Sequence, residues 1–331
     1  MPQNLPASLV RLLESHGAEY APHYPPSDNS DHGPMAYLAM HGLGIGPHDI
    51  EAFAKRYRVR LIAASPPKEA VSVERWRDHI GRRESYSALI AFFRKEIAGQ
   101  GWEPTVARYL PHLISGWVKD AFHPLIRLAY GIEFEMPSEI ACGLAYMTIT
   151  GIDPRLTELA KARPTDLRGR EHFDSTRVER KPIFIRGPFN LRYERIVEGA
   201  KLAPCGGGAV DTMEELSHAC LEIFHATHDF FALHLVTSSH AFRVCAPWAG
   251  PNSDSVFSIG LASAYLAIGA PEFASLEDAV DVIPFEKLAK AKDEHDIKLA
   301  YSAKAQARAY DDPTYEWVAA HYLTPRLSSI A

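Results

Sequence analysis

Helical periodicity constrains the fold of this chain more than any other feature of its sequence. Apolar residues recur at spacings of three and four in segments spread along most of its length. Residues 84–98 show the pattern clearly, and Gly99 is a stop signal for that helix. The apolar stripe of this segment consists of Tyr86, Leu89, Ile90, Phe93 and Ile97. The pattern predicts an all-α protein.

Four further segments have the composition or the boundary residues of helices. They are residues 104–121, 136–149, 211–235 and 284–310. Pro104 and Pro284 suit the first turn of a helix, whereas Pro111 must end or kink the first of these segments. Asp211 and Glu214 form a start that resembles a capping box. Residues 136–149 are mostly apolar, with small residues that suit close packing.

Evidence for β-strands is thin. The best candidate is the segment VRLIAAS, near residue 59. Residues 18–33 and 246–254 are predicted loops, because they are rich in proline, glycine and small polar residues.

The chain is expected to fold as one domain over residues 1–331. It contains no internal repeat, low-complexity tract or clear linker. We expect a compact multi-helix bundle with a metal site between buried helices. An N-terminal helical part would cover roughly residues 1–100, and a metal-binding core roughly residues 104–310.

Composition narrows the class of protein. Apolar residues make up 47% of the chain, enough for a sizeable core, and the net charge of -6 argues against nucleic-acid binding. No apolar stretch is long enough to span a bilayer, and the first residues lack the pattern of a secretory signal. The cysteines show no paired spacing, so we expect reduced thiols in a cytoplasmic protein. They are Cys142, Cys205, Cys220 and Cys245.

Sixteen histidines are present, and several stand in apolar segments. His123 precedes Pro124, which places it at a predicted helix start with apolar neighbours. A buried imidazole needs partners for its nitrogens, and either a metal or the backbone at a helix cap can supply them. His32 stands two residues before Pro34, at the start of a short predicted helix that Gly42 closes. His32 can equally be a surface loop residue.

His234 is the best single candidate for a functional histidine. It lies in HDFFALHLVTSSHAF, which is apolar around nearly its whole circumference and therefore predicted to be buried. His228 and His240 each stand six residues from it, roughly 240° around a helix. They cannot share its face unless the helix breaks. Whether His228 or His240 replaces one of the assigned ligands stays open, as does a purely structural role for His234.

His295 and Lys298 share the inward stripe of the last long predicted helix. A lysine is almost never fully buried unless it is paired, so an ion pair or a snorkelling side chain is one interpretation. The other is that burial lowers the pKa of Lys298 and yields a neutral amine that reacts with carbon dioxide. The resulting carbamate is an anionic oxygen donor that can bind a metal.

Two pairs match the Glu-x-x-His pattern of di-iron bundles: Glu215 with His218, and Glu222 with His225. Both lie on one predicted helix, about 10 Å apart along its axis, whereas a di-iron site takes one pair from each of two helices. This match is therefore interpreted as accidental. The sequence contains no dinucleotide-binding fingerprint, nucleophile elbow, HExxH or P-loop motif.

Four segments in this order resemble the questin-oxidase-like family. They are DHGPMAYLAMHGLG, YLPHLISGWVKDAFHPLIRLAYGIEFE, HDFFALHLVTSSHA and EHDIKLAYSA, and the resemblance covers roughly residues 25–310. It implies an all-helical oxygenase whose fungal members cleave or oxidise anthraquinone rings. It also implies a mononuclear iron, Fe(II), held by four histidines and a carboxylated lysine. Carried over by position, the ligands are His32, His123, His234, His295 and Lys298.

The expected reaction is oxygen-dependent oxidation of a fused-ring aromatic or quinone, with molecular oxygen as co-substrate. Candidate pocket walls are Trp117, Tyr130, Tyr146, Phe230 and Phe231, with core packing as the expected role of most of them. Glu133 and Asp229 are the expected partners that fix the imidazole tautomers. Two other enzyme classes stay open: a metal-dependent hydrolase with a carbamylated lysine, and an NADPH-dependent oxidase of the Baeyer–Villiger type. A helical binding protein with structural histidines is the third alternative.

Overall fold

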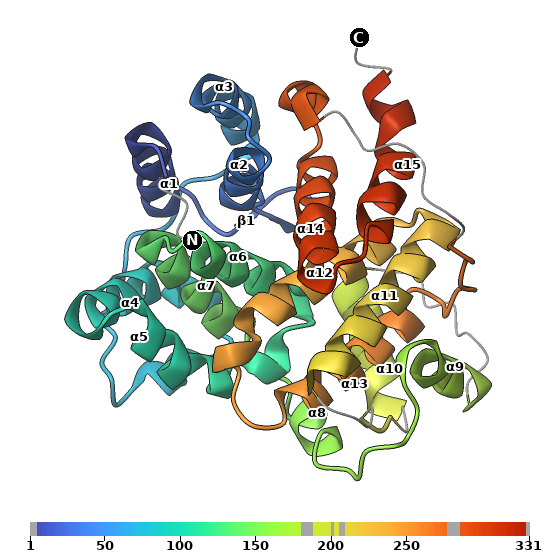
Figure 1. The fold of residues 1–331 in the computed structure, drawn as a ribbon. Helices are drawn as coiled ribbons and strands as arrows, with labels where there is room; N and C mark the ends of the chain where they lie inside the picture. The colour runs from blue at the N-terminus through green and yellow to red at the C-terminus, as the bar shows by residue number, and fades with distance from the viewer. Residues whose placement is uncertain (1–4, 180–187, 200–201, 205–208, 277–284, 329–331) are drawn as a thin grey trace.

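The all-α prediction is confirmed. The computed structural model describes residues 5–179, 188–199, 202–204, 209–276 and 285–328. Within those ranges the chain forms fifteen α-helices, several short 3₁₀ turns and one two-stranded hairpin (Figure 1). The hairpin pairs β1 (His23–Tyr24) with β2 (Asn29–Ser30) and lies in the segment 18–33 predicted to be a loop.

The helices of the first half lie between residues 7 and 159. They are α1 (Ala7–Glu19), α2 (Gly33–Gly42), α3 (Pro47–Tyr57), α4 (Tyr86–Gln100), α5 (Trp102–Tyr109), α6 (His123–Glu133), α7 (Pro137–Thr150) and α8 (Pro154–Leu159). Those of the second half are α9 (Gly169–Glu179), α10 (Phe189–Gly199), α11 (Ala209–Thr227), α12 (Phe230–Cys245), α13 (Ser253–Ala267), α14 (Glu294–Tyr310) and α15 (Thr314–Ser328).

Glycines bring α6 and α7 into close contact at the centre of the bundle. A Cβ atom on Gly143 of α7 would lie only 2.5 Å from the Cα atom of Leu128 in α6. In the same way, a Cβ atom on Gly131 of α6 would lie 2.7 Å from the backbone nitrogen of Ile140. Both distances are too short for real carbon atoms, so this pair of helices requires glycine on both sides. The small residues of segment 136–149 therefore do serve close packing.

Three of the predicted helices differ from the observed ones. The helix expected over 104–121 begins at Trp102 and ends at Tyr109, because Pro111 cannot continue it and 3₁₀ turns follow. The helix expected over 211–235 is two helices, since His228 has a left-handed backbone (φ 48°) between α11 and α12. α11 begins at Ala209, so Asp211 does not start it.

The last long helix is shorter than predicted. Residues 285–290 form a 3₁₀ turn, and α14 begins only at Glu294, where the Asp293 side chain caps it. Pro284 lies outside the described residues. The prediction of a strand near residue 59 is also wrong, because Arg58–Arg60 is a 3₁₀ turn. Only Ala63 makes an isolated β-bridge, with Tyr20.

The buried cysteines agree with the expectation of reduced thiols. Cys142, Cys220 and Cys245 are free and buried, and Cys205 lies outside the described residues. Among the helices that are described, none combines the length and apolar character needed to cross a membrane.

Four helices that are distant in sequence pack around one another at the middle of the molecule. α2 packs on α6, α6 on α12, α12 on α14, and α14 back on α2 (Figure 1). Each of the four bears one of the histidines singled out in the sequence, at or near its N-terminal end. The fold therefore brings together residues that are more than 260 positions apart in the chain.

Candidate metal centre

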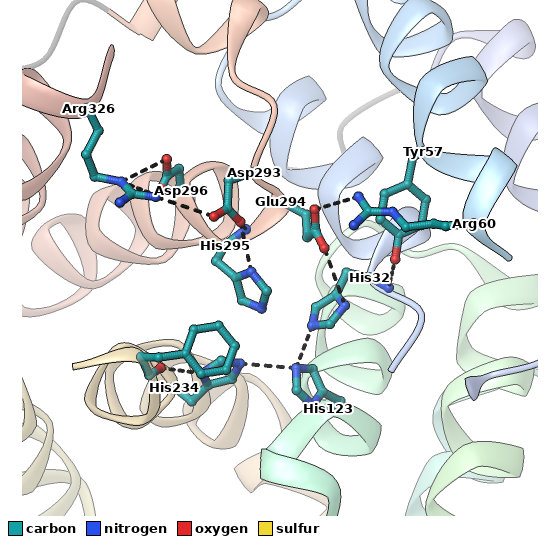
Figure 2. Close-up of polar contacts among 11 residues, drawn as sticks. His32, Tyr57, Arg60, His123, His234, Asp293, Glu294, His295, Asp296 and Arg326 are labelled. Atoms are coloured by element: carbon teal, nitrogen blue, oxygen red, sulfur yellow. Dashed lines mark hydrogen bonds and ion pairs between the residues drawn. The ribbon is translucent and has the colours of Figure 1, made fainter. Parts of the chain in front are cut away.

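His32, His123, His234 and His295 face one another across the space between the four helices (Figure 2). One ring nitrogen from each lies within 4.8 Å of the others. The Nε2 atom of His123 lies 2.7 Å from Nε2 of His32 and 3.1 Å from Nε2 of His234. The structure thus brings together all four histidines named from the sequence.

An unusual turn presents His123. The three residues before it, Asp120, Ala121 and Phe122, all have positive φ angles, of 51°, 49° and 69°. Such backbone is strained for residues other than glycine and persists only where surrounding contacts hold it. The contacts here centre on Asp120, whose side chain bonds to His23, Thr150 and Asn190.

Main-chain carbonyls fix the tautomers of His123 and His234. Nδ1 of His123 lies 2.5 Å from the Asp120 carbonyl oxygen, and Nδ1 of His234 lies 2.7 Å from that of Phe230. A carbonyl oxygen can only accept, so each Nδ1 carries the proton and each Nε2 of a neutral ring presents a bare lone pair. Two such lone pairs 3.1 Å apart repel unless a cation lies between them.

Carboxylates orient the other two rings. Nδ1 of His295 donates to Asp293 at 2.9 Å, and its Nε2 atom is buried with no hydrogen-bond partner in the described structure. Nδ1 of His32 makes no hydrogen bond to the described residues, but it lies 3.9 Å from the Glu294 carboxylate, whose charge favours a proton on that nitrogen. Glu294 is itself held by Arg60 at 2.9 Å (Figure 2). A metal-binding imidazole usually donates its second nitrogen as His295 donates to Asp293.

Burial keeps the imidazoles neutral. It lowers the pKa of His32, His123 and His234 well below the usual range, and the neighbouring histidines and Lys298 lower these pKa values further. The pKa of His295 is also lowered, first by burial and then by Lys298. A neutral imidazole is the form that binds a metal, so all four rings are ready to act as ligands near pH 7.

Lys298 lies one turn beyond His295 on α14, and none of its surface is exposed. Its Nζ atom has no hydrogen-bond partner among the residues that the structure describes. Burial lowers the pKa of this amine to about 7, and the charges of Glu294, Asp293 and Asp31 partly offset the effect. A buried lysine without a hydrogen-bond partner, whose amine loses its proton near pH 7, fits neither an ion pair nor a snorkelling side chain.

The residues present fit a bound transition metal. Four imidazole nitrogens converge, and carbonyls fix the tautomers of two rings. Three buried nitrogens, Nδ1 of His32, Nε2 of His295 and Nζ of Lys298, have no hydrogen-bond partner among the described residues. Helix N-termini carry partial positive charge, which by itself disfavours a cation. Negative ligands are therefore needed beside the histidines, and a carbamate on Lys298 would be one.

A cleft of about 780 Å³ leads from the surface to these histidines. His32, His123 and His295 form part of its lining, and aromatic side chains form another part. These aromatic residues are Tyr24, Phe189, Phe230 and Phe231. The cleft is large enough to admit a small organic molecule to the histidine cluster.

Residues 29–185 match the family model described as questin oxidase-like. Over these residues the chain resembles the questin-oxidase-like family. Curated relatives include a questin oxidase of Aspergillus terreus, 30% identical over 146 residues, and a second of Aspergillus fumigatus, 29% identical over 147 residues. A Baeyer–Villiger oxidase of Pestalotiopsis fici, ptaJ, is 28% identical over 148 residues.

Similarity to these questin-oxidase-like relatives covers only part of either chain. The aligned regions span 40% or 41% of this chain and 33% of each of the three relatives. His32 and His123 lie within the range that matches the family model, whereas His234, His295 and Lys298 lie beyond it. The structure adds that the second group of residues folds back onto the first.

Two of the five candidate pocket walls lie in the cleft of this chain. Phe230 and Phe231 line it, and the Phe230 ring lies 4.7 Å from the ring of His234. Trp117, Tyr130 and Tyr146 do not line it. They pack in the core, and Tyr146 bonds to Ser30 and His23.

Neither expected tautomer partner touches the four rings. Glu133 pairs with His240 at 3.1 Å, and Asp229 caps α12 by accepting from the N–H groups of Phe231 and Ala232. Because His240 is held by Glu133 and by Ser302 at 3.1 Å, it does not replace one of the four. His228 points to a different cluster, with His225 and His321.

The two Glu-x-x-His pairs do not form a common site, in agreement with the interpretation of this match as accidental. Glu215 pairs with Arg168 and Glu222 with Arg170. His218 lies 3.8 Å from Glu222, whereas His225 belongs to the cluster with His228 and His321.

Sequence reasoning missed the residues that orient the rings. Asp293 could have been found, because an aspartate just before a helical run is a typical N-cap. The carbonyl groups of Asp120 and Phe230 could not have been found in the sequence, because every residue has a main-chain carbonyl. Arg60 and Glu294 are 234 positions apart, and only the fold brings them together.

Proposed function

We propose that this chain is a mononuclear non-haem iron, oxygen-dependent oxidoreductase that acts on a fused-ring aromatic or quinone substrate. The observation that carries the proposal is the convergence of bare Nε2 lone pairs, above all those of His123 and His234 at 3.1 Å. The iron would be held by His32, His123, His234, His295 and a carboxylated Lys298.

The donor set suits iron(II), which accepts imidazole nitrogen together with anionic oxygen. The buried amine of Lys298 would attack carbon dioxide, forming the N–C bond of a carbamate and releasing one proton. The carbamate adds a negative charge to a site that four helix N-termini make positive. When bound, iron(II) would supply the dioxygen chemistry that amino-acid side chains lack.

The cleft supports a flat aromatic substrate. Phe189, Phe230 and Phe231 offer apolar ring faces, and stacked rings gain from burial and from their quadrupoles. The N-termini of the four helices that carry the histidines would favour a phenolate oxygen over a neutral phenol. The relatives named questin oxidase support oxidation of an aromatic compound.

Electrons for the reaction would come from the substrate itself. A reduced hydroxyquinone carries two electrons more than its quinone, so a nicotinamide such as NADPH would serve only to reduce the substrate beforehand. The residues of the protein would bind the ring system, keep bulk water from the histidine cluster and hold the four imidazoles deprotonated at Nε2.

A second candidate is an NADPH-dependent oxidase of the Baeyer–Villiger type, which the name of the Pestalotiopsis fici relative favours. The two candidates differ in what they consume. The first requires iron and a reduced substrate, and the second requires NADPH in proportion to product.

The test is oxygen uptake by iron-loaded protein. The protein is incubated anaerobically with chemically reduced anthraquinones, oxygen is admitted, and products are identified by mass spectrometry. We expect uptake without NADPH that is lost in His234→Ala and retained in His240→Gln, which alters a buried histidine of the same helix outside the cluster.

Equal uptake by parent and His234→Ala would overturn the proposal. Uptake that requires stoichiometric NADPH would favour the Baeyer–Villiger candidate. Turnover of an ester or amide by a zinc-loaded form, without oxygen uptake, would point to the metal-dependent hydrolase instead.

A further inference from the structure

A second cluster of histidines lies outside the four-histidine site. His225 is in the last turn of α11, His228 follows that helix directly, and His321 is on α15. One ring nitrogen from each lies within 4.8 Å of the others. The ring centroids of His225 and His321 are 5.3 Å apart, and those of His228 and His321 are 5.9 Å apart.

The end of α11 is built to turn His228 back beside His225. The N–H group of His228 donates to the Phe224 carbonyl oxygen at 2.8 Å, and His228 takes the left-handed backbone typical of a residue just after a helix. Histidine is less suited to this backbone than glycine or asparagine. A Tyr322 ring from α15 packs 5.3 Å from His228 and 5.1 Å from Phe224.

α15 supplies the opposite wall. His321 and Trp317 are four residues apart, so they share one face of this helix. The Trp317 ring lies 4.9 Å from His225 and 5.8 Å from His321. The tryptophan thereby limits the directions in which both imidazoles can turn.

The three imidazoles are available as ligands. Nδ1 of His225 is buried and has no hydrogen-bond partner among the described residues, while His228 and His321 are exposed. Partial burial, followed by the neighbouring imidazoles, lowers the pKa of His225. The pKa of His228 is lowered by burial and by His321. Both rings are therefore neutral at pH 7, the form that binds a metal.

We propose that His225, His228 and His321 form a second, surface metal site that takes a divalent transition ion of the zinc type. Three imidazoles and one water complete the tetrahedral set that zinc prefers. The same nitrogens would bind copper(II) more tightly if it were present.

An ion here would join α15 to the corner between α11 and α12. α12 carries His234 in its second turn, and α15 carries Arg326, which bonds to Asp293 and Asp296 beside His295. The second site would thus steady two elements that border the four-histidine site. It does not depend on what that site does.

Zinc binding to the full chain tests the site. Zn²⁺ alone is titrated into metal-stripped protein, and bound equivalents are counted by calorimetry and by plasma mass spectrometry after desalting. The variants are His321→Ala and His228→Asn, the second of which keeps a residue that tolerates left-handed backbone. His48→Ala, which alters an exposed histidine at the start of α3, is the control.

We expect the parent and His48→Ala to bind one zinc equivalent more than either cluster variant. Loss of one direct ligand should weaken zinc binding at this site at least about tenfold. Loss of a hydrogen-bond partner of a ligand already weakens metal binding by about that factor. Zinc should also slow hydrogen exchange in α15 of the parent and not of the variants. Equal stoichiometry and affinity in all four proteins would overturn the proposal. If His321→Ala does not fold, His228→Asn carries the comparison.

Discussion

Nε2 of His123 lies 3.1 Å from Nε2 of His234, although each ring already donates its Nδ1 proton to a main-chain carbonyl. Neither nitrogen can donate to the other while both rings are neutral. Burial disfavours the charged ring that would resolve the contact, because it lowers the pKa of both. A cation between the two nitrogens removes the conflict.

His240 shows what a buried structural histidine looks like in the same helix. It lies 3.1 Å from Glu133 through one nitrogen and 3.1 Å from Ser302 through the other. Both of its nitrogens have protein partners, as buried polar groups require. Nε2 of His234 faces only another imidazole, and this contrast with His240 favours the proposed ligand role of His234.

The first prediction concerns Asp293, which caps α14 and accepts from Nδ1 of His295. Asp293→Ala should weaken iron binding roughly 10- to 100-fold, because a partner that fixes a ligand tautomer is lost. Asp229→Ala is the matched control, since Asp229 caps α12 without touching an imidazole. It should lower the free energy of unfolding by about 1 kcal/mol and leave iron affinity nearly unchanged. Equal iron affinity in the two variants would show that Asp293 acts only as a cap.

The second prediction concerns the carboxylation of Lys298. Lys298→Ala should bind iron weakly, and added formate or acetate should restore part of the binding by replacing the missing oxygen donor. The same additions should not improve binding in the parent. Lys287→Ala, which alters an exposed lysine, serves as control. A high-resolution density map that shows an unmodified ammonium group at Lys298 in iron-loaded protein would rule the carbamate out.

The third prediction is a pH dependence of stability from the pair Glu133 and His240, which joins α6 to α12. Burial acts to raise the pKa of Glu133, but interactions with His240, and after them with Arg243 and Tyr301, outweigh it and lower that pKa below its usual value of 4.5. The folded protein therefore binds this proton less readily than the unfolded chain. The pair's contribution is present above about pH 4.5 and is lost as pH falls through the lower, folded value.

Urea unfolding at neutral and acid pH measures the effect. Glu133→Gln should reduce the free energy of unfolding by about 1 to 3 kcal/mol at pH 7 and by less near pH 3. A reduction of the same size at both pH values would contradict the sign of the shift.

Local patterns predicted the helices that have a polar face and clear end signals. Segment 84–98 became α4, and Pro34 and Gly42 bounded α2 as expected, because caps and periodicity act locally. α13 was missed, since it is buried on every side and so lacks an amphipathic stripe. The break at His228 was missed because nothing in that stretch resembles a glycine stop signal.

The four histidines could be named from the sequence because each stands in an apolar segment or at a helix start, in the order that the family resemblance implies. The groups that orient these histidines could not be named from the sequence. The orienting groups are two backbone carbonyls and the acidic pair before and within the first turn of α14. Glu133 and Asp229 were plausible by composition, but each is used elsewhere, for an ion pair and for a helix cap.

The most direct test of the central claim is the metal content of the protein, measured by plasma mass spectrometry after loading with iron(II) without oxygen and removing excess metal. We expect one equivalent bound by the four-histidine site in the parent and in His240→Gln, and its loss in folded His123→Ala and His234→Ala. Circular dichroism would establish that each variant is folded. Unchanged iron content in both folded alanine variants would contradict the account.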